Sequence, residues 1–298
     1  MIHITTVSNR QHPYIYSTIM LSDMYCVYVY VYNVGTINLL DLQGEMSSQA
    51  KTSADCYKRA STFQADIGLQ FIQKLAPDLG SIVLDLGCGT GFLATALSKH
   101  VGPEGKVTAV DPDENRLVLA QQNYAADNIS FMVGDDKTFP NNQYDLVFAN
   151  CVVHWIDDKF ALFNCVYQNL KPGGKFAFTT GKGPVLAKGI MDELLGAGVL
   201  DNLFPNNATF LSPAEYNTLA ALVGFEVAST EVKEILWTFK SVDTVIDYYF
   251  GLLQGDLDHA SINPQCLECC RDKYDKDLPN RVDPQDMLHI VLVKPLIS

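Results

Sequence analysis

Short apolar segments that alternate with helical patterns constrain the fold of this chain more than any other feature. Five such segments, each typical of a buried strand, lie at residues 82–86, 106–110, 129–133, 144–149 and 175–180. Between them, helical spacing of apolar residues covers 93–101, 113–124 and 158–170. Parallel strands joined by helices are covered on both faces, so this alternation predicts a doubly wound α/β fold. Ligands bind such folds beyond the carboxyl ends of the strands.

Segments on either side of this core extend the same pattern. Helices are predicted over 54–76, 184–200, 213–223 and 242–253, and a turn over 171–174. Strand-like segments at 225–239 and 287–293 extend the sheet to seven strands, which are mostly parallel with a C-terminal antiparallel strand. We therefore expect an N-terminal extension of uncertain status (1–45), a Rossmann-like core (46–181) and a region that adds the last strands and a helical substrate cap (182–298).

The charge of the chain excludes some classes of partner. The 298 residues carry a net charge of −13, and 48% of them are hydrophobic, which is typical of a soluble globular protein. A nucleic-acid groove or a polybasic membrane anchor needs clustered Lys and Arg, so neither is expected. Residues 182–298 hold 17 acidic residues against nine basic ones. This excess disfavours a highly anionic substrate unless local basic residues offset it.

The N-terminal region carries an apolar run, MYCVYVYVYNV, at residues 24–34. Eleven residues are too few to cross a bilayer as a helix, and the Val and Tyr content favours an added β element or a poorly specified tail. Residues 1–45 are interpreted as an accessory extension or as a misassigned upstream start. No secretory signal pattern is present, and eight Cys without framework spacing predict reduced thiols in the cytoplasm.

Three of these cysteines, Cys266, Cys269 and Cys270, form a CxxCC cluster. Such a cluster suggests binding of a metal or a soft metalloid. A zinc site usually has four ligands in two separated pairs, and no second pair lies nearby in the sequence. We therefore expect thiols on a helix and no metal site.

The strongest local signal is the glycine run Gly87-Cys88-Gly89-Thr90-Gly91 after the strand at 82–86. Alternate glycines allow a sharp turn and close approach of a ligand. Asp111 follows at the end of the next strand, where a carboxylate can accept the ribose hydroxyls of an adenosine. Phe92 occupies the position where a dinucleotide fingerprint has glycine, and the Gly-Lys-Ser/Thr of a P-loop is absent.

These motifs resemble those of the class I S-adenosylmethionine-dependent methyltransferases. The resemblance covers roughly residues 50–180 and rests on five segments in order: VLDLGCGTG at 83–91, VTAVDPD at 107–113, VGDD at 133–136, YDLVFANCVVHW at 144–155 and LKPGGKFAFT at 170–179. It implies S-adenosyl-L-methionine as the cofactor, which carries the reactive group while the protein supplies position and electrostatics.

The resemblance assigns the cofactor contacts to ten residues: Asp85, Gly87, Cys88, Gly89, Gly91, Asp111, Pro112, Asp135, Asp136 and Asn150. The loop residues would contact the methionine half through backbone groups, and Asp85 would order the loop or reach the cofactor amine through water. Asp111 would hold the ribose, with Pro112 by the adenine. Asp135 would receive the adenine amino group, and Asn150 would lie under the methionyl group. Asp113 and Asp136 have a simpler alternative as helix caps.

His154 is the candidate catalytic residue, and it forms a His-Trp pair with Trp155. The pair resembles that of methyltransferases acting on trans-aconitate and juvenile hormone acid, which methylate carboxylates. Histidine suits proton transfer near neutral pH, but a structural or substrate-orienting role is an open alternative. Residues 57–70 are similar to the start of the malonyl-carrier-protein methyltransferases. Tyr57, Arg59 and Gln64 are therefore candidate substrate residues, with an amphipathic covering helix as the alternative.

Aromatic residues of the expected cap, including Trp237, Tyr248 and Tyr249, either line an apolar pocket or fill a core. Together the patterns predict methyl transfer to a small molecule at a carboxylate or hydroxyl oxygen. The alternatives are a nitrogen or arsenic acceptor and a cofactor-binding regulator without catalysis. The cysteines here do not match the positions that arsenite methyltransferases use. The oligomeric state is left open.

Overall fold

The computed structural model describes residues 3–8, 15–21, 25–31, 62–203, 208–253 and 262–296. The chain divides into two compact units, residues 1–48 and 49–298. The first unit contains a three-stranded antiparallel sheet in the order β1 (His3–Ser8), β2 (Ile15–Leu21) and β3 (Tyr25–Val31). β3 lies within the Val- and Tyr-rich run, so the prediction of a β element there is confirmed.

A seven-stranded sheet organises the second unit, in the order β6-β5-β4-β7-β8-β10-β9. Its strands are β4 (Ile82–Leu86), β5 (Lys106–Asp111), β6 (Ile129–Val133), β7 (Tyr144–Asn150), β8 (Leu170–Gly181), β9 (Glu226–Trp237) and β10 (Asp283–Val293). The pairs from β6 to β8 are all parallel, whereas β10 runs antiparallel to both β8 and β9. The predicted mostly parallel sheet with a C-terminal antiparallel strand is therefore confirmed.

Two local predictions were wrong. The 171–174 segment, predicted as a turn, belongs to the start of β8. Gly173 takes a positive φ of 79° there, and the pairing of β7 with β8 shifts register beside it, so the strand absorbs the turn as an irregularity. The helix predicted over 184–200 is two helices, α6 (Val185–Leu195) and α7 (Val199–Leu203). Gly196 and Gly198, with φ of 102° and 78°, separate them.

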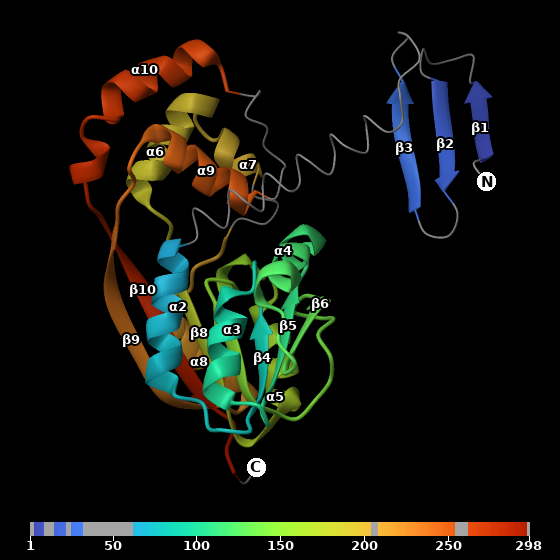
Figure 1. The fold of residues 1–298 in the computed structure, drawn as a ribbon. Coiled ribbons are helices and arrows are strands. Elements are labelled where there is room, and N and C mark those ends of the chain that lie inside the picture. The colour runs from blue at the N-terminus through green and yellow to red at the C-terminus, as the bar shows by residue number, and fades with distance from the viewer. Residues whose placement is uncertain are drawn as a thin grey trace. The chain divides into compact units, whose positions relative to one another are not determined.

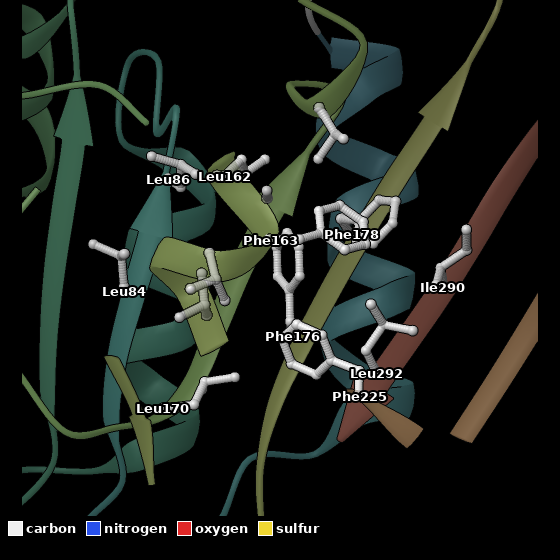
Figure 2. Close-up of a cluster of buried hydrophobic side chains, with 14 of the residues drawn as sticks. Leu84, Leu86, Leu162, Phe163, Leu170, Phe176, Phe178, Phe225, Ile290 and Leu292 are labelled. Atoms are coloured by element: carbon white, nitrogen blue, oxygen red, sulfur yellow. The ribbon is translucent and has the colours of Figure 1, made fainter. Parts of the chain in front are cut away.

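Helices cover both faces of the sheet (Figure 1). One face packs on α2 (Thr62–Leu75), α3 (Phe92–Val101) and α4 (Glu114–Tyr124), which contribute buried residues such as Phe71, Leu97 and Leu117. The other face packs on α5 (Lys159–Asn169) and α8 (Pro213–Val223) through Phe163 and Tyr216. Figure 2 shows Phe163 of α5 against Phe176 and Phe178 of β8. Burial of both faces explains the near-continuous apolar strands.

A second group of helices forms a cap with its own apolar cluster. It contains α6, α7, α9 (Val242–Leu252) and α10 (Pro264–Tyr274), which Figure 1 shows gathered beyond one end of the sheet. Ile190, Met191, Trp237, Val245 and Ile246 are among the buried residues of this cluster. Its separate core makes the cap a distinct layer over that end of the sheet. Of the helices in the described ranges, none is long and apolar enough to cross a bilayer.

Candidate active site

The strand order places a ligand crevice between β4 and β7. From β4 the chain proceeds to β5 and β6 on one side, and β7 and β8 continue on the other, so the direction of winding reverses between β4 and β7. The carboxyl ends of strands on either side of such a reversal leave a crevice. The glycine run begins at the end of β4, and Asn150 ends β7. Most of the predicted cofactor residues therefore lie on the side where the crevice opens.

The glycine loop adopts a backbone that requires glycine. Gly87, Gly89 and Gly91 have φ values of 72°, 55° and 87°, all in the left-handed region. A Cβ on Gly87 would collide with the side chain of Val152, and one on Gly91 would lie 2.8 Å from the Cβ of Ala120. The loop thus makes a sharp turn directly into the N-terminus of α3.

Hydrogen bonds from the loop to β5 fix its position. The amide groups of Gly87 and Cys88 donate to the Val110 carbonyl at 2.8 and 2.9 Å, and the Gly89 amide donates to Asp111 Oδ2 at 2.8 Å. Since these three amides are already used, backbone contacts of Gly87, Cys88 and Gly89 with a ligand would come from their carbonyl groups. This refines the expectation for the loop.

Asp111 lies at the end of β5 and is buried. Its Oδ1 accepts a hydrogen bond from the Asp113 amide at 3.0 Å. Burial raises the pKa of the Asp111 carboxyl, and the charge of Arg116 opposes that rise. Asp113 is the N-cap of α4, so the capping alternative is confirmed for this residue. Pro112 is exposed between the two acids.

Asp85 is the most unusual polar residue at this edge, because it is only 2% exposed and its Oδ2 has no hydrogen-bond partner among the described residues. Burial and the nearby charge of Asp111 raise its pKa to about 7. A buried carboxylate without a partner suits a cationic ligand group. S-adenosylmethionine carries an ammonium and a sulfonium group, so this orphaned oxygen, the ribose-type acid Asp111 and the glycine turn fit that cofactor.

The two acids after β6 differ in their surroundings. Asp135 Oδ1 accepts hydrogen bonds from the amides of Lys137 and Thr138 and from Thr138 Oγ1, at 2.7–2.9 Å. The bond from Thr138 contributes most to lowering the pKa of Asp135, while burial raises the pKa of Asp136. Asp135 therefore shapes its own turn with one oxygen, and its second carboxylate oxygen is the one that can face a ligand.

The end of β7 joins three elements. Asn150 donates from Nδ2 to the Gln64 carbonyl of α2 at 3.0 Å and accepts from Thr179 Oγ1 of β8 at 2.8 Å. Cys151 follows with a positive φ of 58°, which is uncommon for a residue other than glycine. Its amide donates to the Thr179 carbonyl at 3.1 Å, which helps to hold this strained backbone.

A cavity of about 370 Å³ lies between the ends of β7 and β8 and the cap. It is lined by Gln64, Cys151, His154, Trp155, Gly181, Lys182, Gly183, Pro184, Val185, Lys188, Leu200, Asp201, Ala208, Phe210, Trp237, Tyr248, Tyr249, Leu252 and Met287. The structure therefore brings His154 together with three of the predicted substrate residues, Gln64, Trp155 and Trp237. Tyr57 and Arg59 lie outside the described residues.

His154 is positioned within the wall of this cavity by its neighbours. It is 6% exposed, its Nδ1 lies 3.2 Å from Thr180 Oγ1, and its ring stacks on Phe210 with centroids 4.9 Å apart. Burial, with a smaller effect from Lys159, lowers its pKa to about 3. The imidazole is therefore neutral at physiological pH and is a weak base. Its geometry favours the orienting role over proton abstraction.

Several cavity residues were missed in the sequence. Lys188 forms ion pairs with Asp192 and Asp201 at 2.9 and 3.2 Å, and it lies in the cavity wall with Asp201. Met287 reaches the same wall from β10. These residues come from separate cap and strand elements, and no local motif marks them. Within the cap, the aromatic content of 237–250 was the sequence signal that pointed to this wall.

The cysteine cluster lies on α10, where Cys266 and Cys269 are exposed and Cys270 is buried. Within the described residues, no group of three His, Cys, Asp or Glu side chains could hold a metal ion. The cluster and the cavity share no residue.

Comparisons with known proteins agree with this geometry. Residues 83–174 match a family described as a methyltransferase domain. A demethylmenaquinone methyltransferase of Lactobacillus johnsonii is 31% identical over 56% of this chain and 70% of its own length. A malonyl-[acyl-carrier protein] O-methyltransferase of Priestia megaterium is 30% identical over 48% of this chain and 52% of its own length. The chain spans about half the length of the first curated relatives it matches.

A solved structure shares the fold. Phosphoethanolamine N-methyltransferase 2 of Haemonchus contortus, in complex with S-adenosyl-L-methionine, superimposes with a TM-score of 0.53. It is 17% identical, and the match covers 91% of this chain and 63% of that chain.

Proposed function

Because the chain belongs to the class I S-adenosylmethionine-dependent methyltransferases, we propose that it transfers a methyl group to a carboxylate oxygen of a small molecule. The cavity beside the cofactor crevice carries this proposal, since it combines a mostly apolar wall with a neutral, oriented His154. A carboxylate is already deprotonated and needs no base, whereas a hydroxyl or ammonium acceptor does. The O-methyltransferase name of one relative also favours an oxygen acceptor.

The residues at the crevice would hold the cofactor as follows. Asp85 would receive its ammonium group, Asp111 its ribose hydroxyls, and the Gly87–Gly91 loop would pack against its methionine half. Pro112, Asp135 and Asp136 would border the adenine, and Asn150 would lie below the methionyl group. When bound, S-adenosylmethionine supplies an electrophilic methyl carbon.

The residues of this chain would contribute orientation and exclusion of water. Trp155, Trp237 and the cap helices would surround the acceptor, and the cap would keep solvent from the methyl group. In the tautomer whose Nδ1 accepts from the Thr180 hydroxyl, Nε2 carries the ring proton and would donate a hydrogen bond to the acceptor carboxylate. Lys182 supplies positive charge in the same wall, whereas Lys188 is already paired with Asp192 and Asp201.

The proposed partner is a small molecule and neither nucleic acid nor a membrane. The net charge of −13 supports this, because both of those surfaces attract basic proteins. A cytoplasmic location is supported by the free state of six cysteines: Cys88, Cys151, Cys165, Cys266, Cys269 and Cys270.

Transfer of labelled methyl groups tests the proposal. The protein would be incubated with methyl-labelled S-adenosylmethionine and a panel of apolar carboxylic acids, each with its matched alcohol and amine. We expect label in base-labile methyl esters.

Asp111→Ala should weaken binding of S-adenosylhomocysteine, measured by calorimetry, about 10- to 100-fold through loss of charged hydrogen bonds. The exposed Asp127→Ala serves as the matched control and should bind as the wild type does.

Other outcomes would redirect the proposal. Label on amines would replace the oxygen acceptor with nitrogen, and label on an added arsenite sample would indicate arsenic. Tight cofactor binding without transfer to any cellular metabolite would favour a regulator.

A further inference from the structure

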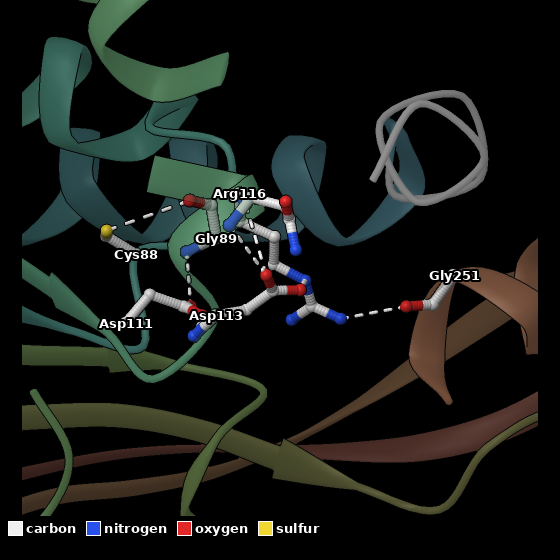
Figure 3. A network of polar contacts seen from close by, with 7 residues as sticks. Cys88, Gly89, Asp111, Asp113, Arg116 and Gly251 are labelled. Atoms are coloured by element: carbon white, nitrogen blue, oxygen red, sulfur yellow. Dashed lines mark hydrogen bonds and ion pairs between the residues drawn. The ribbon is translucent and has the colours of Figure 1, made fainter. Parts of the chain in front are cut away.

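Arg116 connects the cap to the cofactor edge of the sheet, which is the edge that carries the Gly87–Gly91 loop and Asp111. It lies in the first turn of α4 and is 8% exposed. Its Nε lies 3.3 Å from Asp113 Oδ2, and its Nη2 donates to the Gly251 carbonyl at 2.8 Å, across 135 positions of sequence. Figure 3 shows the guanidinium between the Asp111–Asp113 loop and Gly251 of the cap. One buried side chain therefore contacts both layers of the unit.

On the cofactor side, Arg116 is tied to the carboxylate expected to hold the ribose. Asp113 caps α4 with its side chain, and its own amide donates to Asp111 Oδ1 at 3.0 Å. Asp111 Oδ2 in turn accepts from Gly89 of the glycine loop. The positive charge of Arg116 also lowers the pKa of Asp111 against the effect of burial. A change in the hydrogen bonds of Asp111 would thus reach Arg116 through a single residue.

On the cap side, the contact is to the C-terminal end of α9. Gly251 is the second-last residue of that helix, where carbonyl groups lack intrahelical partners and carry partial negative charge. A buried cation at this point stabilises the helix end. The same helix supplies Tyr248, Tyr249 and Leu252 to the cavity wall. Arg116 therefore contacts the helix that carries this part of the wall.

The other end of α9 is held within the cap. Arg271 of α10 pairs with Asp243 at 2.7 Å, and Asp275 accepts from the Val242 amide at 2.7 Å. Hence α9 is fixed to the cap at its N-terminus and to the cofactor edge at its C-terminus.

We propose that Arg116 is a positioning residue that couples cofactor binding to the ordering of α9 over the substrate cavity. The inference rests on the proposed function, because it takes Asp111 as the ribose carboxylate. Cofactor hydroxyls on Asp111 would fix the Asp111–Asp113 loop and with it the guanidinium that holds Gly251. By thermodynamic reciprocity, an ordered α9 would also strengthen cofactor binding.

Hydrogen exchange with and without S-adenosylhomocysteine tests the coupling. In the wild type, saturating ligand should slow exchange in residues 87–91, 111–116 and 242–252, the last by at least about fivefold. In Arg116→Met, slowing at 87–91 should persist while slowing at 242–252 is lost. Arg116→Lys should restore only part of it, because an ammonium lacks the planar fork that reaches both partners.

Arg271→Met is the matched control, since it removes the partly exposed arginine that holds the opposite end of α9. It should raise exchange in 242–252 but keep the ligand-dependent slowing.

A merely structural Arg116 would leave that slowing at its wild-type size in Arg116→Met, and this result would overturn the proposal. If Arg116→Met does not fold, wild-type slowing of 242–252 in Arg116→Lys would overturn it equally. Protection of 87–91 without any change at 242–252 in the wild type contradicts the coupling alone. No protection at 87–91 contradicts the proposed cofactor instead.

Discussion

Asp85 is the residue at which folding and cofactor binding make opposite demands. It occupies the penultimate position of β4, and its Oδ2 lacks a partner among the described residues. A group of this kind costs stability until a ligand supplies the missing interaction. We infer that the chain keeps this unpaired carboxylate because the cofactor ammonium completes it. The stability cost of this buried carboxylate and its part in cofactor binding then have the same cause.

The pH dependence of cofactor binding should report the state of Asp85. Its pKa in the free protein is about 7, and the cationic ligand requires the carboxylate form. Affinity for S-adenosylhomocysteine should therefore be nearly constant above pH 8 and fall by about tenfold between pH 8 and pH 6. Calorimetry between pH 6 and pH 8 would measure this. Asp85→Asn should bind S-adenosylhomocysteine more weakly, and its affinity should not change with pH. If the affinity of both proteins changes equally with pH, the pH dependence belongs to another group.

At the scale of elements, the approach of α2 to the sheet shapes the site. Gly68 of α2 is buried, and a Cβ there would collide with Leu93 of α3 and lie 3.0 Å from Asn150 Cγ. The missing side chain lets α2 come close enough for its Gln64 carbonyl to accept from Asn150. This contact sets the position of Gln64 in the cavity wall.

Gly68→Ala should therefore push α2 away from the sheet. We expect a loss of about 1–3 kcal/mol in the free energy of unfolding from overpacking. Gly189→Ala is the control, since Gly189 is an exposed residue of α6 with open space around it. There alanine should gain about 0.5–1 kcal/mol through helix propensity. Urea denaturation measures the change in the free energy of unfolding for both variants. Stabilisation by both substitutions would show that a Cβ fits at Gly68 without displacing α2.

The elements that the sequence predicts well are those whose signal is local. The strand at 82–86, the glycine loop and Asp111 each follow from neighbouring residues, and the structure has them in the expected order. Gly68, Lys188 and Met287 have no such signal, because their roles arise only where α2, α6 and β10 meet other elements. The role of Arg116 likewise depends on a contact 135 positions away. The break between α6 and α7 shows the same limit, since two glycines override a continuous helical pattern.

At the scale of the whole molecule, we expect the buried, neutral His289 to limit stability in acid. His289 lies on β10, the strand that joins β8 to β9, and is 3% exposed against the ring of Phe71. Neither of its ring nitrogens has a hydrogen-bond partner in the part of the chain that the structure describes. Burial, and to a lesser extent Lys233, lowers its pKa to about 4. Protonation of His289 therefore opposes the closed sheet.

The sign of this effect can be tested directly. In the unfolded chain the pKa of histidine is about 6.5, so between pH 6.5 and pH 4 the unfolded state binds the proton and the folded state does not. His289 should therefore reduce the free energy of unfolding as the pH falls through that window. His289→Leu keeps a similar volume without a titratable nitrogen. The free energy of unfolding of this variant minus that of the wild type should be about 2 kcal/mol larger at pH 5 than at pH 8. Urea denaturation at both pH values measures this, with the partly exposed His100→Gln as the control. If the difference in the free energy of unfolding between His289→Leu and the wild type is the same at pH 5 and pH 8, His289 takes up its proton without unfolding the sheet.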